Sequence, residues 1–225
     1  MTTKKQMKSL FDVLVARNSD LVVKEHRFFK VPYLLLKPVR HVCRAISIDR
    51  TSRADCPVFH WHVGHCFSSH GRLDGLAWEW FWMPRGRPNQ WSEPGFTETA
   101  VETIENSILP MLRRAQTIDD MFRIEGFPRS FEYDSALAYR PFRISMSAAL
   151  GNWEEALAVY EETRHGAIRE WELESHQKAF ELGALVAAGD RAAVIALLHQ
   201  WEDEFVVRNG LEDIYEPTPF PLEQL

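Results

Sequence analysis

The sequence has few cysteines, no long hydrophobic run and none of the common catalytic motifs. Its 225 residues include only Cys43, Cys56 and Cys66, and no CxxC pair occurs. So small and odd a number favours reduced thiols, so we expect a cytoplasmic protein without a disulfide framework. The apolar runs span only a few residues, which predicts no transmembrane helix and no membrane partner. A phosphate-binding glycine loop, a GxSxG elbow and an HExxH pair are also missing, so no motif identifies a reaction.

Charge is distributed unequally along the chain. The net charge is −6, but residues 1–90 hold 15 Lys and Arg against 7 Asp and Glu, whereas residues 91–225 hold 11 against 25. The basic residues of the first part are scattered singly, without the clustered stripe typical of nucleic-acid binding. The acidic part would repel a phosphate backbone. We therefore expect no nucleic acid among the partners, and the acidic part predicts a basic protein partner.

Residues 1–128 have the pattern of an α+β domain. Helical spacing predicts an amphipathic first helix through Met7, Leu10, Phe11, Leu14 and Val15. Five segments rich in Val, Ile, Phe and Trp follow, at 21–30, 33–37, 40–49, 57–67 and 77–83. Apolar and polar residues alternate within several of them, which is typical of antiparallel strands with one packed face. Turn-forming residues between the segments favour a meander sheet.

A second helix is predicted after the Pro- and Gly-rich loop PRGRPNQWSEPGF. It spans about 97–115, with Thr97 as the candidate N-cap. Pro110 lies inside this helix and should kink or interrupt it. A short helix near 117–125 and the tripeptide GFP at 126–128 then close the first domain.

Residues 129–225 predict a second domain of helical hairpins. Gly151-Asn152 and Gly189-Asp190 are helix stops 38 residues apart, and an amphipathic helix follows each. The stretch LGNWEEALAVYEE resembles the turn and second helix of a tetratricopeptide-type repeat, with Ala156 at the small-residue position. The second copy, AAGDRAAVIALLHQWE, is less similar. The resemblance implies a helical-repeat architecture with a binding groove, and it implies no catalysis.

The first domain resembles a family of uncharacterised bacterial α+β domains that are often grouped with immunity proteins of polymorphic toxin systems. The segments that carry this resemblance are MKSLFDVLVAR, ISIDRTSRADCPVFHWHVGHCF and ETIENSILPMLRRAQTIDDMF. The resemblance implies a helix, an antiparallel sheet and closing helices. It provides no catalytic residue.

The stretch FHWHVGHCF concentrates histidines on one predicted strand. On a strand His60 and His62 point to one face, and His41 and Cys43 alternate outward on a neighbouring strand. Four such ligands could hold one zinc ion. The simpler interpretation is that the imidazoles occupy the wet or half-covered face of the sheet. No acidic residue nearby in the sequence would orient a metal-bound imidazole.

The tryptophans and the acidic helices bear on partner binding. Trp78, Trp80 and Trp82 alternate on one strand face, and we interpret them as a core stripe, with a ligand platform as the alternative. Trp91 lies in a loop and is the better candidate for an exposed contact. Candidate partner-binding carboxylates lie on the helix after Gly151, namely Glu154, Glu155, Glu161 and Glu162.

Two functions from different classes remain open. The first is a non-enzymatic protein-binding module, of which a toxin-binding immunity protein is a specific version. The second is a zinc-dependent enzyme or metal-binding module that uses the sheet histidines. The repeat, the unequal charge and the missing catalytic motif favour the first.

Overall fold

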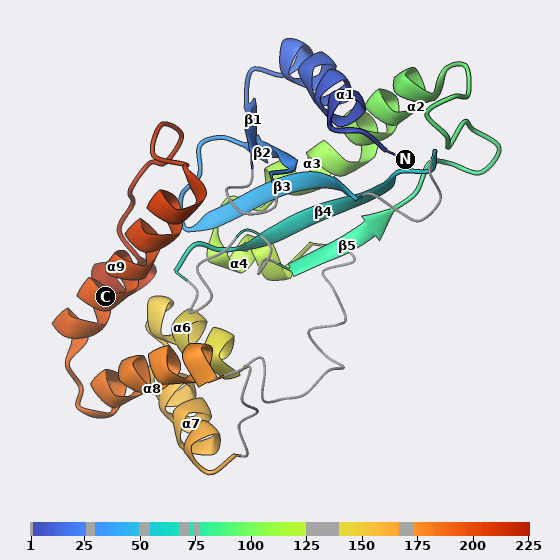
Figure 1. Ribbon diagram of the computed structural model, residues 1–225. Coiled ribbons are helices and arrows are strands. Elements are labelled where there is room, and N and C mark those ends of the chain that lie inside the picture. Colours follow the sequence, from blue (N-terminus) through green and yellow to red (C-terminus); the bar gives the residue numbers. More distant parts are fainter. Residues whose placement is uncertain are drawn as a thin grey trace. The chain divides into compact units, whose positions relative to one another are not determined.

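The chain forms two compact units of an α+β protein (Figure 1). The computed structural model describes residues 2–25, 30–49, 55–67, 73, 77–124, 140–166 and 173–225. The first unit comprises Met1–Gly64, Leu76–Phe127 and Asp213–Tyr215, and the second comprises His65–Gly75, Pro128–Glu212 and Glu216–Leu225. None of the described helices is both long and apolar enough to cross a bilayer.

The first unit contains a five-stranded antiparallel sheet. Its strands are β1 (Leu21–Glu25), β2 (Pro32–Leu36), β3 (Val42–Asp49), β4 (Val58–His65) and β5 (Ala77–Phe81). They are ordered β1-β2-β3-β4-β5, so each strand pairs with its neighbour in sequence. All five predicted segments therefore form strands, and the predicted meander is confirmed. Strand β5 is the last strand of the sheet and pairs with β4, where His60 lies opposite Trp80 and Trp61 opposite Glu79.

Helices α1 (Lys4–Arg17) and α2 (Phe96–Thr103) lie on the same side of the sheet (Figure 1). Helix α1 begins at a capping box in which Thr3 and Gln6 bond reciprocally. Four of the five residues of the predicted stripe are buried, Val15 is half-buried, and the helix packs against β1 and β2. On β4, the ring of Phe59 lies 6.3 Å from the ring of Phe96 in α2. This face of the sheet is the hydrophobic core of the first unit.

The helix after the sheet changes its hydrogen bonding ahead of a proline. It continues from α2 into a π-helical turn (Ile104–Ile108) and then α3 (Leu109–Arg114), before the short α4 (Ile118–Phe122). The Leu109 N–H donates to the Ile104 carbonyl five residues back, and Pro110, which has no N–H, follows directly. The predicted interruption at Pro110 is confirmed. The predicted N-cap Thr97 is wrong, because the N-cap is Gly95, two residues earlier, and α2 begins at Phe96.

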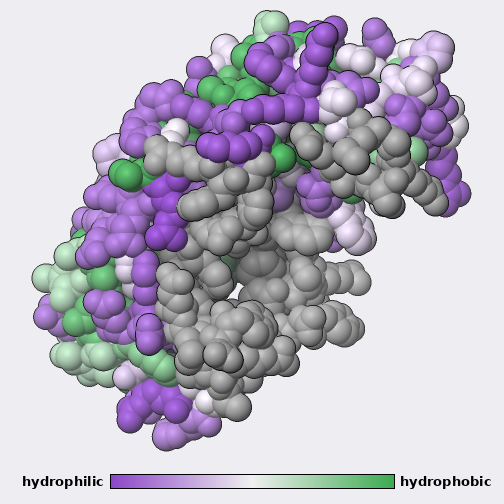
Figure 2. Space-filling view, viewed as in Figure 1, coloured by the Kyte–Doolittle hydropathy of each residue, from purple (hydrophilic) through white to green (hydrophobic). Residues whose placement is uncertain are grey.

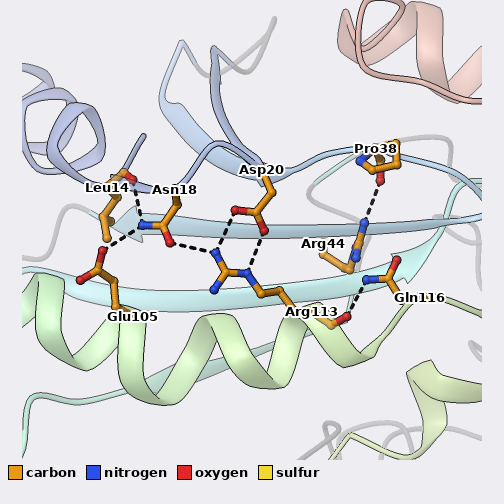
Figure 3. Close-up of polar contacts among 8 residues, drawn as sticks. All are labelled: Leu14, Asn18, Asp20, Pro38, Arg44, Glu105, Arg113 and Gln116. Atoms are coloured by element: carbon orange, nitrogen blue, oxygen red, sulfur yellow. Dashed lines mark hydrogen bonds and ion pairs between the residues drawn. The ribbon is translucent and has the colours of Figure 1, made fainter. Parts of the chain in front are cut away.

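A polar cluster around Arg113 joins the end of α1, the approach to β1 and the π-helical region (Figure 3). The Arg113 Nε and Nη2 atoms donate to the two carboxylate oxygens of Asp20, each at 2.8 Å, and Nη2 also donates to the Asn18 Oδ1 at 2.8 Å. The Asn18 amide in turn donates to the Leu14 carbonyl and to Glu105. The hydrogen bond from Arg113 holds the pKa of Asp20 below its ordinary value.

In the described residues of the second unit the chain forms four longer helices and a terminal 3-10 turn. They are α6 (Arg140–Ala149), α7 (Trp153–Arg164), α8 (Leu173–Ala187), α9 (Arg191–Asn209) and Pro221–Gln224. Helix α8 packs against α6, α7 and α9. A side chain at Gly183 would meet the Tyr160 ring, since a Cβ there would lie 2.1 Å from Tyr160 Cδ2. Glycine therefore permits the close approach of α7 and α8.

The two hairpin turns of this unit have the same backbone geometry. Gly151 and Gly189 both adopt positive φ, +80° and +71°. The N–H groups of Asn152 and Asp190 each donate to the carbonyl five residues back, at 2.8 and 3.1 Å. The turns that the sequence aligns at a spacing of 38 residues are thus equivalent in structure. The resemblance to tetratricopeptide-type repeats stays a prediction.

Two short segments belong to a different unit from their neighbours in sequence. Asp213–Tyr215 belongs to the first unit, where it forms a parallel bridge with Val39. His65–Gly75 belongs to the second unit, where the ring of Phe67 meets the ring of Phe220 edge-on at 5.0 Å. The units are therefore interleaved along the chain, whereas the sequence analysis expects a single boundary after residue 128.

Candidate functional site

Polar side chains gather on the sheet face opposite the helix-covered core. The Ser47 Oγ lies 2.8 Å from the His62 Nε2, which places these positions of β3 and β4 opposite one another. Tyr33 on β2 pairs with Ser47, and its ring lies 5.5 Å from that of His62. Because alternate residues share a face, Asp49 and His60 follow on the same side. We call the set Tyr33, Ser47, Asp49, His60, His62 and Trp80 the histidine face.

Most of the histidine face is buried. His60 is 7% exposed and His62 is 4% exposed. Seven of the eight residues of β3 are buried, on both sides of the strand. The expectation that these imidazoles occupy a wet or half-covered face is therefore wrong, because the centre of the sheet is covered on both faces.

The four predicted zinc ligands are not brought together. Cys43 is four residues along β3 from Ser47, so extended geometry puts it about 13 Å from the position opposite His62. His41 lies further along the chain, just before β3 begins. Within the described ranges no three His, Cys, Asp or Glu side chains are arranged to hold a metal ion. Zinc binding through His60 and His62 stays a prediction without a third ligand among these residues.

The bond between Ser47 and His62 has the geometry of a nucleophile and its base, but its surroundings do not suit catalysis. Burial, reinforced by the adjacent His60, lowers the pKa of His62 to about 3. A base with such a pKa accepts a proton poorly near neutral pH. The His62 Nδ1 has no hydrogen-bond partner in the described part of the chain, so no orienting acid completes a triad there. The pair fits a buried structural hydrogen bond.

Trp80 and Trp82 are exposed at the outer strand. Trp80 is 51% exposed and Trp82, directly after β5, is 66% exposed. The prediction that they belong to a core stripe is therefore wrong for both, and the side chain of Trp78 lies outside the described residues. Figure 2 shows a mainly hydrophilic described surface on the side viewed there, with hydrophobic residues in small areas. Two neighbouring exposed indoles on one edge are therefore unusual for this protein.

Trp91, the tryptophan predicted to be exposed, is instead half-buried. Its indole Nε1 donates to the Thr2 hydroxyl at 3.0 Å, and its ring meets Phe96 edge-on at 4.8 Å. Its backbone N–H donates to the Asp55 carbonyl. These contacts tie the loop to the N-terminus and to α2, so Trp91 fits a structural anchor better than a partner contact.

The four glutamates predicted to bind a partner all lie on α7. Glu154, Glu155 and Glu162 are exposed, and Glu161 is half-buried. Three of them form ion pairs with arginines of the same unit: Glu155 with Arg143 at 3.4 Å, Glu162 with Arg140 at 3.4 Å, and Glu161 with Arg164 at 3.1 Å. Much of the negative charge of this surface is therefore compensated by arginines of α6 and α7.

The carboxylates near Trp80 have different partners from the glutamates of α7. The Asp49 Oδ2 lies 3.7 Å from the His60 Nε2, and the Asp49 side chain is 61% exposed. Glu79 accepts the Trp80 backbone N–H at 2.9 Å. Burial lowers the pKa of His60 below its ordinary value, and the carboxylates of Asp49 and Glu79 only partly oppose this shift. The imidazole therefore stays neutral near pH 7. Asp49 lies on the same face as Trp80, whereas Glu79 projects from the opposite face and its carboxylate turns back to the Trp80 backbone N–H at the strand edge.

Comparisons with known proteins assign no function. No family model, no curated protein and no solved structure matched this chain. The two family resemblances therefore stay predictions.

Proposed function

We propose that this protein is a non-enzymatic protein-binding module and that its contact surface is the outer strand β5 with Trp80 and Trp82. The observation that carries the proposal is the exposure of both indoles on the edge of a sheet whose remaining apolar residues are mostly buried. Tryptophan is enriched at binding hot spots, because its large ring buries much area with little loss of conformational freedom. We call Trp80 and Trp82 the tryptophan edge.

The energy available at the tryptophan edge is enough for specific binding. A buried indole removes about 150 to 250 Å² from water. At roughly 25 cal/mol per Å², burying the exposed halves of two indoles contributes about 4 to 6 kcal/mol before the costs of association. Exposed indoles lower the solubility of a protein, and a bound partner would cover them.

The surface of α7 is the weaker candidate. Its exposed apolar side chain, Leu157, is much smaller than an indole. Its glutamates are mostly paired with arginines of the same unit, and exposed ion pairs of this kind contribute little. A basic partner would have to compete with those arginines for each carboxylate.

A toxin-binding immunity role is the specific version of this proposal. It rests on the resemblance of the first domain to immunity-type domains and on the absence of a recognised catalytic motif. It expects a secreted toxin to be encoded beside this gene. A gene neighbourhood of housekeeping enzymes alone would remove its support.

The tryptophan edge predicts the outcome of a double substitution. Replacing Trp80 and Trp82 by alanine should weaken capture of the partner from the source organism and lower the affinity of the purified complex. Each hot-spot indole is expected to contribute about 2 kcal/mol, or roughly thirtyfold in Kd. Titration calorimetry with the captured partner measures the change.

A matched control separates this surface from α7. The double variant Glu154→Gln and Glu155→Gln removes exposed charge from α7 and should leave the affinity within about threefold. Thermal unfolding of both variants checks that the fold is intact. Full affinity in the tryptophan variant, or a large loss in the glutamine variant, would move the contact surface away from β5.

A further inference from the structure

A row of three side chains crosses the sheet beside the tryptophan edge. Asp49 on β3, His60 on β4 and Trp80 on β5 lie on one face. The Asp49 Oδ2 is 3.7 Å from the His60 Nε2, and the rings of His60 and Trp80 are 6.3 Å apart. From Asp49 and Trp80 towards His60, exposure falls from more than half to less than a tenth. The two outer side chains of the row are therefore exposed, and the central His60 is buried.

Among the described residues, no lysine or arginine forms an ion pair with the carboxylates of this row. The Asp49 carboxylate contacts the His60 imidazole, and Glu79 accepts a hydrogen bond from the Trp80 backbone N–H. Neither carboxylate is paired with a Lys or Arg among the residues that the structure describes, in contrast to the glutamates of α7. Because His60 is neutral near pH 7, it does not neutralise Asp49 either.

We propose that the row Asp49–His60–Trp80, together with Glu79, forms a subsite for an arginine side chain of the protein partner. This inference rests on the proposed function. The partner's guanidinium stacks on the exposed face of the Trp80 indole and donates to the Asp49 carboxylate, with Glu79 as a second counter-charge. Arginine fits better than lysine, because a planar guanidinium both stacks on an indole and forks to a carboxylate.

The charges of the subsite disfavour other ligands that stack on tryptophan. Two carboxylates beside the ring would repel the phosphates of a single-stranded nucleic acid. A neutral sugar ring could stack on the indole, but its binding would not depend on the charge of Asp49 or Glu79. Sensitivity to those two charges is therefore the property that distinguishes an arginine ligand.

The test uses two peptides and charge-neutral variants of the full chain. The probe is an acetylated, amidated hexapeptide of alternating Arg and Val, and its matched control carries citrulline, the neutral isostere, in place of each Arg. Binding is followed through the Trp indole N–H signals in NMR spectra, with Trp80 assigned by its Trp80→Phe variant. We expect the Arg peptide to bind at least fivefold more tightly than the citrulline peptide and to shift the Trp80 signal.

Variants show whether the charges are responsible. Asp49→Asn together with Glu79→Gln should reduce binding of the Arg peptide to the level of the citrulline peptide, since glutamine can still accept the Trp80 N–H. Glu154→Gln, on α7, should leave it unchanged. Equal binding of both peptides, no binding at millimolar concentration, or indifference to the Asn and Gln variants would overturn the arginine subsite.

The two proposals can fail separately. If Trp80→Ala with Trp82→Ala abolishes capture of the partner but the Asp49→Asn and Glu79→Gln changes do not weaken it, the tryptophan edge stands and the arginine subsite is wrong. If neither set of changes weakens capture, the contact surface lies elsewhere and both proposals are wrong.

Discussion

At the scale of single residues, His62 shows how burial determines the chemistry of a side chain. Its Nε2 is satisfied by Ser47, and its ring is almost fully enclosed. A charged imidazole in that place would lose its hydration without gaining a counter-charge. With its pKa lowered to about 3, the ring stays neutral in the folded protein at neutral and mildly acidic pH.

This neutrality makes stability depend on pH. In the unfolded chain His62 takes up a proton near its ordinary pKa of 6.5, whereas burial lowers its pKa in the folded protein to about 3. The unfolded state therefore binds more protons below pH 6.5, and the free energy of unfolding falls by up to about 1.4 kcal/mol per pH unit from pH 6.5 towards pH 3. We expect the variant His62→Gln to have a clearly shallower slope between pH 6 and pH 5, measured by urea unfolding.

The exposed His165 provides the control, since 78% of its side chain is accessible. His165→Gln should leave the slope unchanged. An unchanged slope in His62→Gln as well would show that this ring is protonated in the folded protein, and the buried pair with Ser47 would need another account.

At the scale of elements, the cluster around Arg113 is expected to stabilise the first unit. Arg113→Lys should lower the free energy of unfolding by about 1 kcal/mol, because one ammonium cannot bridge both oxygens of Asp20 and Asn18 at once. The loss is small because Arg113 and Asp20 are each about a third exposed, so water screens the pair. Denaturant titration at pH 7 measures the difference.

The pH dependence of this difference in unfolding free energy tests whether Asp20 is the carboxylate responsible. Since the pKa of Asp20 is held below its ordinary value of 3.8, its contribution is complete above that value and disappears as the pH falls below it. The difference between wild type and Arg113→Lys should therefore shrink as the pH falls below 3.8. The control Arg87→Lys weakens an ion pair with Glu102 that is more than half exposed, and it should cost no more than about 0.5 kcal/mol. Equal losses at positions 113 and 87 would contradict a special role for the cluster.

The elements themselves could largely be predicted from sequence, whereas exposure at the sheet edge could not. Alternation and turn residues predict all five strands, and the glycine pairs predict the hairpin turns that Gly151 and Gly189 form. Alternation also places Trp80 on one face, but it cannot tell whether that face is covered at the last strand. For the same reason the sequence predicts the wrong exposure for Trp80 and Trp91. The partner that half-buries the Trp91 indole is Thr2, 89 residues away in the sequence.

At the scale of the whole molecule, the interleaved units predict that the first 127 residues are not independent. A fragment 1–127 lacks Asp213–Tyr215 and with it the bridge to Val39. It also carries His65–Gly75 without the helices that this segment joins. We expect its thermal midpoint to fall by more than about 5 °C relative to the full chain.

Adding back the missing chain tests the cause. Co-expression of residues 128–225 as a separate polypeptide should restore the midpoint, because both exchanged segments regain their units. A fragment 1–127 that melts at the temperature of the full chain would show that the exchanged segments contribute little. The interleaving would then describe topology without consequence for stability.

The contact between Glu79 and the Trp80 backbone affects how readily copies of the protein associate through β5. An outermost strand offers spare amide groups to which a second copy could add its own strand, and such growth leads to fibrils. Here a carboxylate of the same chain occupies the Trp80 N–H and adds repulsion between like molecules. The exposed indoles of Trp80 and Trp82 can thus lie at the sheet edge with a lower risk that copies of the protein polymerise through this strand.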